Sequence, residues 1–70
     1  MDITNRFMVT IIGDGKHIGV TAPPRAPMTT DDAIVLAAWL VMMADIVDVV
    51  VPGATAKERF ELALREIQNS

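Results

Sequence analysis

The chain has 70 residues, a net charge of −3 and no cysteine, and 51% of its residues are hydrophobic. The missing thiols exclude disulfides and thiolate metal sites, and six Lys and Arg residues are too few for the basic surface that nucleic-acid binding requires. A chain this short forms one domain, residues 1–70, with a small core. Its high hydrophobic content therefore predicts a homo-oligomer, with a dimer as the first expectation.

Residues 6–22 have the pattern of a β-hairpin, with two alternating runs on either side of the sequence Gly-Asp-Gly-Lys. A two-residue type I′ turn at Asp14 and Gly15 is expected, because both residue types tolerate positive φ. That turn sets a register in which six apolar side chains share one face, with Ile11 opposite Ile18, Val9 opposite Val20 and Phe7 opposite Ala22. A lone hairpin is marginal in water, so this face is expected to pack on a helix.

A proline-rich connector, residues 22–27, follows the hairpin. Pro24 and Pro27 form a PxxP pair, which is the minimal polyproline recognition pattern. A stiff link between the hairpin and the next element explains the same residues, because proline fixes φ and removes backbone donors. The sequence does not decide between these two roles.

The first helix is predicted over residues 29–50. Thr29 suits the N-cap position, with Asp32 three residues later, and Pro52 marks the region where the helix must have ended. Residues 33–44 form an uncharged run of twelve. A membrane span needs about 20 apolar residues, so this run predicts a buried helix and no membrane span.

The side chains of this helix are apolar almost all round, which is more surface than a hairpin and one further helix can cover. We therefore expect part of it to contact another protein. The candidate partner-binding residues on this helix are Ile34, Trp39, Val41 and Met42. For Trp39 the alternative interpretation is that it is simply the largest residue of the core.

The second helix is predicted over residues 55–69, starting with a capping box formed by Thr55 and Glu58. Its apolar residues recur at a spacing of three to four and make one stripe: Ala56, Phe60, Ala63, Leu64 and Ile67. Leu62 points away from this stripe and is the fifth candidate for partner binding. Together the elements predict an α+β fold of order β-β-α-α, a hairpin packed on two antiparallel helices.

The sequence Gly-Asp-Gly-Lys at 13–16 resembles the end of a phosphate-binding loop, but that motif needs glycine at position 10 and Ser or Thr at position 17. Thr10 and His17 stand there instead, so a hairpin turn is the better interpretation. His17 is the single histidine of the chain. A histidine titrates near neutral pH, but the sequence assigns no role to this one.

Four aspartates on the first helix are the remaining candidates for a metal site, but the pair Asp31 and Asp32 lies about 21 Å of helix from the pair Asp45 and Asp48. Helix capping and solubility account for them. No Ser-His-Asp arrangement is available either, because the single histidine is expected at the hairpin tip. The sequence therefore predicts no enzyme, no catalytic residues, no metal site and no cofactor.

The stretch from Pro27 to Asp45, which follows a hairpin ending in two prolines, resembles a group of short, uncharacterised proteins encoded by bacteriophages and prophages. These share a helix start of the form [ST]-x-[DE]-A-x-x-L-A-A-W-L, which is matched here by Thr30, Asp32, Ala33, Leu36, Ala37, Ala38, Trp39 and Leu40. Residues 64–67, Leu-Arg-Glu-Ile, resemble the closing helix of the same group.

The resemblance implies a phage accessory protein in the cytoplasm of a bacterial host, acting by protein–protein interaction on a host or phage protein. Two other functions stay open at this point. One is a phage regulatory protein acting on transcription, which the acidic charge disfavours. The other is a peripheral membrane protein that uses the apolar surface of the first helix.

Overall fold

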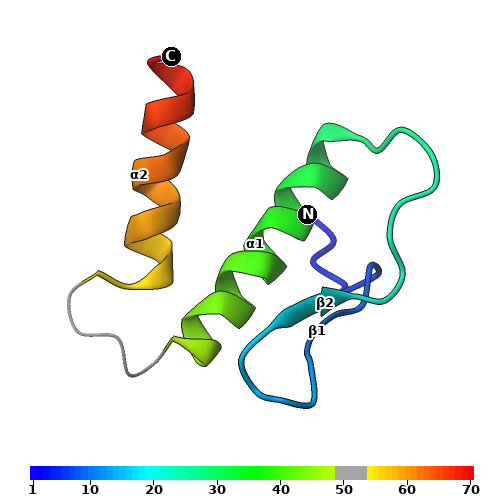
Figure 1. Ribbon diagram of the computed structural model, residues 1–70. Coiled ribbons are helices and arrows are strands. Elements are labelled where there is room, and N and C mark those ends of the chain that lie inside the picture. Colours follow the sequence, from blue (N-terminus) through cyan, green and yellow to red (C-terminus); the bar gives the residue numbers. More distant parts are fainter. Residues whose placement is uncertain (49–53) are drawn as a thin grey trace.

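The structure is a computed structural model that describes residues 1–48 and 54–70. In chain order it contains β1 (Val9–Ile11), β2 (Ile18–Val20), α1 (Thr30–Val47) and α2 (Ala56–Gln68). Figure 1 shows the β1–β2 hairpin on one side of α1 and α2 on the other side. The predicted α+β class and the β-β-α-α order are confirmed.

The register of the hairpin is the predicted one, with Val9 opposite Val20 and Ile11 opposite Ile18. The regular ladder is shorter than the predicted span 6–22, because Met8 adopts a positive φ of 50° and bends the chain out of β1. Beyond this bend, the Ala22 N–H still donates to the Phe7 carbonyl at 3.1 Å. Phe7 and Ala22 are thus neighbours, as expected, but outside the strands.

The predicted type I′ turn is wrong. The Gly15 N–H donates to the Ile12 carbonyl at 2.8 Å, and the Ile12 N–H donates to the His17 carbonyl at 2.9 Å, so residues 13–16 form a four-residue loop. Gly15 has a φ of 72°, whereas Asp14 is not among the described residues with positive φ. The Asp14 carboxylate instead accepts the Lys16 N–H at 2.8 Å, which is the geometry of an Asx turn.

The Asp14 carboxylate gives the hairpin tip a pH dependence. Hydrogen bonds from the Lys16 N–H and from the His17 ring lower the pKa of Asp14 below its ordinary value of 3.8. A lowered pKa in the folded state means that the carboxylate stabilises the tip above the ordinary value and that this contribution disappears as the pH falls through the folded value. We expect the Lys16 and His17 amide resonances to shift in an NMR titration with a midpoint below 3.8.

The control for this titration is the variant Asp14→Asn, in which the transition of both amides should be absent. A midpoint at or above the ordinary pKa of Asp14 in the wild-type protein would contradict the proposed hydrogen bonding of the tip.

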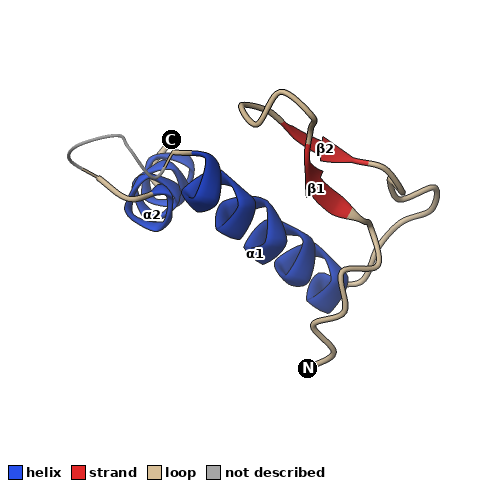
Figure 2. Ribbon diagram, turned by 90° about the horizontal axis from the view of Figure 1, so that it is seen from below, coloured by secondary structure: helices blue, strands red, loops and turns tan. Residues whose placement is uncertain are grey.

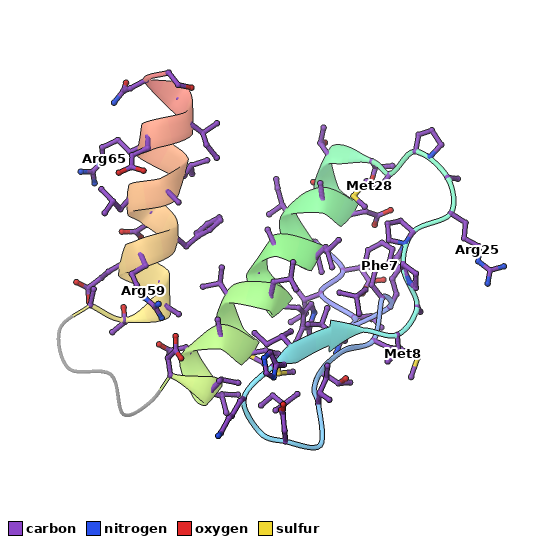
Figure 3. The ribbon with its side chains drawn as sticks, in the orientation of Figure 1. Phe7, Met8, Arg25, Met28, Arg59 and Arg65 are labelled. Atoms are coloured by element: carbon purple, nitrogen blue, oxygen red, sulfur yellow. The ribbon has the colours of Figure 1, made fainter. Side chains whose placement is uncertain are left out.

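The main core lies between β1 and α1. Val9 is 1% exposed and Val35, near the start of α1, is 7% exposed. The six side chains predicted to share the apolar face of the hairpin are all buried or half-buried, whereas Met8, Thr10 and Ile12 of the other face are exposed. Figure 3 shows Met8 pointing away from α1. The alternation of the sequence therefore identifies the face that packs on the helix.

Helix α1 begins as predicted, with Thr29 as the N-cap and its hydroxyl accepting the Asp32 N–H at 3.1 Å. It ends at Val47, short of the predicted residue 50, and residues 49–53 lie outside the described part of the chain. At the C-cap Asp48 the backbone leaves the helical region, and the Asp48 carboxylate pairs with Arg59 of α2.

Helix α2 is capped by Thr55, and both hydrogen bonds of the predicted capping box with Glu58 are present. The two helices run in opposite directions and diverge from their junction, as Figure 1 shows. Figure 2 shows α2 nearly end-on, beside the C-terminal end of α1. Most of the apolar stripe of α2 is therefore left uncovered, with Phe60 40% and Ile67 71% exposed. Only Ala56, at the junction, is buried.

Candidate protein-interaction surface

Two hollows lie along the exposed side of α1, and they share the side chains of Ala38 and Met42. The first, about 260 Å³ in volume, is lined by residues from the N-terminal segment and α1: Met1, Ile3, Ile34, Val35, Ala38, Trp39 and Met42. The second lies between the diverging helices and is lined by Ala38, Val41, Met42, Asp45, Lys57, Phe60, Glu61 and Leu64. Because they share two residues, we treat both hollows as one surface, the α1 groove.

The α1 groove has the composition of a protein-binding surface. Its floor is apolar and well exposed, with Ile34 56% and Met42 45% exposed. Charged side chains occur only in the second hollow, where Asp45, Lys57 and Glu61 contribute to the lining. Protein interfaces also have an apolar centre, often containing Met and aromatic residues, with polar residues towards the rim. Methionine also adapts its shape to different partners.

The N-terminal segment forms one wall of the α1 groove, and three contacts hold it there. The Trp39 indole N–H donates to the Ile3 carbonyl at 2.9 Å, which joins residues 36 positions apart. The Arg6 guanidinium pairs with Asp32 of α1 at 3.2 Å. The Asn5 side chain accepts the Val9 N–H at 2.9 Å and donates to the Val9 carbonyl at 3.0 Å. These contacts place Met1 and Ile3 beside α1.

A local hydrogen-bond turn precedes these contacts. The Asp2 carboxylate accepts the Thr4 N–H at 2.9 Å and the Thr4 hydroxyl at 2.6 Å. The hydrogen bonds from Thr4 lower the pKa of Asp2, and the Arg6 guanidinium contributes to the same shift. The segment is therefore folded by polar residues of its own and not only by α1.

The other wall, formed by α2, is positioned by two aspartates of α1. The Asp45 carboxylate accepts the Ala56 N–H at 3.3 Å, at the first turn of α2. Asp48 forms an ion pair with Arg59, which Figure 3 shows near the base of α2 on the side of the junction. The sequence analysis explained these aspartates by helix capping and solubility, whereas in the structure both contact the start of α2. Within residues 1–48 and 54–70, no three His, Asp or Glu side chains gather as metal ligands would.

The five candidate partner-binding residues do not all lie together. Ile34, Trp39, Val41 and Met42 line the α1 groove, and Trp39 and Val41 among them are half-buried. Leu62 is 51% exposed but is not part of the groove. The groove also contains residues that sequence reasoning did not single out, namely Met1, Ile3, Phe60 and Leu64. The sequence shows that these residues are apolar, but their position beside α1 depends on the long-range contacts described above.

No protein-family model, curated protein or solved structure matches this chain. Among the described residues, neither helix combines the length and the apolar character that crossing a bilayer requires.

Proposed function

We propose that this protein is a small non-enzymatic accessory protein that acts by protein–protein interaction and forms a homo-oligomer. It works in the cytoplasm of a bacterial host, where a phage or prophage protein of this kind binds a host or phage partner. The observation that carries the proposal is the α1 groove, an apolar surface open along one side of the longest helix.

The residue spacing and chemistry of the α1 groove favour a helix as the bound element. An amphipathic helix binds a groove of this type by inserting apolar side chains at positions three to four residues apart. Ile34, Ala38 and Met42 repeat on α1 at a spacing of four and so provide a matching row of contacts. Lys57 and Glu61 at the second hollow can pair with charges that flank the apolar face of the partner helix.

The test is affinity purification from an infected or lysogenic bacterial host, with mass spectrometry of the bound proteins. The variant Met42→Asp places a charge in the middle of the α1 groove and is expected to lose the specific partner, since truncating or charging a central contact costs about 2 kcal/mol or more in binding. The side chain is 45% exposed in the free protein, so the variant should still fold.

The matched control is Met8→Asp. Met8 is 55% exposed and lies on the face of the hairpin that points away from α1. This variant introduces the same charge at a similar exposure and should retain the partner with wild-type affinity. If Met42→Asp captures the same proteins as the wild type, the α1 groove is not the interaction surface.

A further inference from the structure

The outer edge of β2 carries unused backbone hydrogen-bonding groups. In the β1–β2 ladder, Thr10 and Gly19 face each other with their N–H and C=O groups inside the hairpin, so those of Ile18 and Val20 point outward. No hydrogen bond joins these outward groups to any described residue. An open edge of this kind is a template for pairing with another strand.

The open stretch of this edge is short and has defined ends. On one side, the Asp14 carboxylate accepts the Lys16 N–H. On the other side, the Ala22 N–H donates to the Phe7 carbonyl. The available edge is therefore limited to Ile18–Val20, with Gly19 at its centre.

This stretch is complementary to itself. When two copies pair antiparallel with Gly19 opposite Gly19, each Ile18 lies opposite Val20 of the other copy, and these two residues exchange both of their backbone hydrogen bonds. A two-fold axis through the Gly19 pair relates the two copies and repeats this exchange. The pairing therefore forms four hydrogen bonds and uses the outward N–H and C=O groups of Ile18 and Val20 in both copies. The pair on the axis is the closely spaced, non-hydrogen-bonded kind, and glycine has no side chain that would crowd it.

The opposite edge of the hairpin does not offer the same surface. On β1 the outward N–H and C=O of Val9 are already bonded to the Asn5 side chain. The bend at Met8 ends that strand directly afterwards. Pairing through β2 alone adds one copy and then stops, so it gives a closed dimer instead of a fibre.

The apolar side chains also leave room for a second copy. Val9 of β1 is fully buried against α1, whereas Ile18 and Val20 of β2 are only half-buried. In the paired sheet the two β1 strands, each with its own α1, are about 14 Å apart, which exceeds the 8–10 Å that two packed helices need. The two α1 helices therefore fit on the same face without overlap.

The exposed area of the chain supports a missing neighbour. Its accessible surface is 5426 Å². A folded monomer of this mass exposes about 4,300 Å², and each partner in a standard interface buries about 800 Å². The excess is larger than the area that one such interface removes from each partner, although much of it comes from exposed apolar side chains of α1 and α2, such as Ile34 and Ile67.

We propose that the outer edge of β2 binds the same edge of a second copy of this chain, forming a four-stranded antiparallel sheet centred on Gly19. This inference rests on the homo-oligomeric part of the proposed function and names its interface. It leaves the α1 groove open for the other partner.

The test compares Ile18→Pro with Ile11→Pro by sedimentation equilibrium. Ile11 and Ile18 are direct partners in the hairpin, both are half-buried, and both have an outward N–H. Proline is tolerated where a strand N–H faces solvent, so both variants perturb the monomer to a similar extent. Ile18→Pro removes two of the four intersubunit hydrogen bonds and should weaken dimerisation about thirtyfold. Ile11→Pro should dimerise as the wild type does.

A second measurement on the wild-type protein does not depend on the folding of either variant. Amide hydrogen exchange at Ile18 and Val20 should slow as the protein concentration rises, while exchange at Ile11 should not change. A monomer at the highest soluble concentration would overturn the inference, as would a dimer in which exchange at Ile18 is independent of concentration. If Met42→Asp loses the partner but still forms the dimer, the α1 groove and the β2 edge are two independent interaction surfaces.

Discussion

Replacing Val9 by aspartate is expected to unfold the protein. Val9 is 1% exposed and is the largest side chain that is fully buried in the described structure. A carboxylate without a partner at this position costs several kcal/mol in the free energy of folding. A single core in a chain of this size supplies only about 3–5 kcal/mol. Circular dichroism should therefore show the loss of both helices, since the hairpin no longer covers α1.

The control is Thr10→Asp, one residue further along β1. Thr10 is exposed on the other face of the hairpin, so the same charge there remains in water and should leave the spectrum and the melting temperature close to those of the wild type. A folded Val9→Asp variant with the wild-type melting temperature would mean that the hairpin does not pack on α1 through this face.

The features that sequence reasoning predicted correctly depend on neighbouring residues. Helix starts at Thr29 and Thr55 are set by side chains that bond three residues ahead, and these signals are visible in the sequence. The hairpin register follows from alternation, because a shift of one residue would turn every apolar side chain to the wrong face. The register was therefore correct even though the turn at Asp14 was not.

The errors occur where the structure contains side-chain contacts that the sequence pattern does not specify. The early end of α1 coincides with the ion pair between Asp48 and Arg59, which only the folded chain brings together. At the hairpin tip, the Asp14 carboxylate accepts the Lys16 N–H. Asp14 does not adopt the positive φ that a type I′ turn requires. A hydrogen bond from the backbone to a side chain thus accompanies one of the two conformations that the residue types allow at the hairpin tip.

The candidate surface could be predicted only in part, because it depends both on the residue pattern of α1 and on contacts between distant segments. The apolar circumference of α1 indicates that Ile34 and Met42 exceed what the other elements can cover, and both are exposed. The pattern of α2 identifies its apolar stripe but not how much of it packs. That depends on how α2 is placed relative to α1, at a junction where the Asp45 carboxylate accepts the Ala56 N–H. Nothing in residues 1–6 indicates that this segment reaches α1.

The contact between Trp39 and the N-terminal segment can be divided into two parts by substitution. Trp39→Phe keeps an aromatic ring and removes the indole N–H that donates to the Ile3 carbonyl. The loss of one partly exposed hydrogen bond should lower the free energy of unfolding by about 1 kcal/mol. Trp39→Ala also removes the packing of the ring. The side chain is only half-buried, so the cost should be about 2–3 kcal/mol, below the range for a fully buried aromatic residue.

Chemical denaturation of the two variants and the wild type measures these costs, and amide exchange at Ile3 and Arg6 shows where the effect is located. In Trp39→Ala the N-terminal segment should exchange faster because it loses its anchor, while Thr10 within the hairpin keeps its protection. Equal costs for the two variants would assign the whole effect to the hydrogen bond with Ile3. Wild-type stability and exchange in both would mean that the N-terminal segment does not form a wall of the α1 groove in solution.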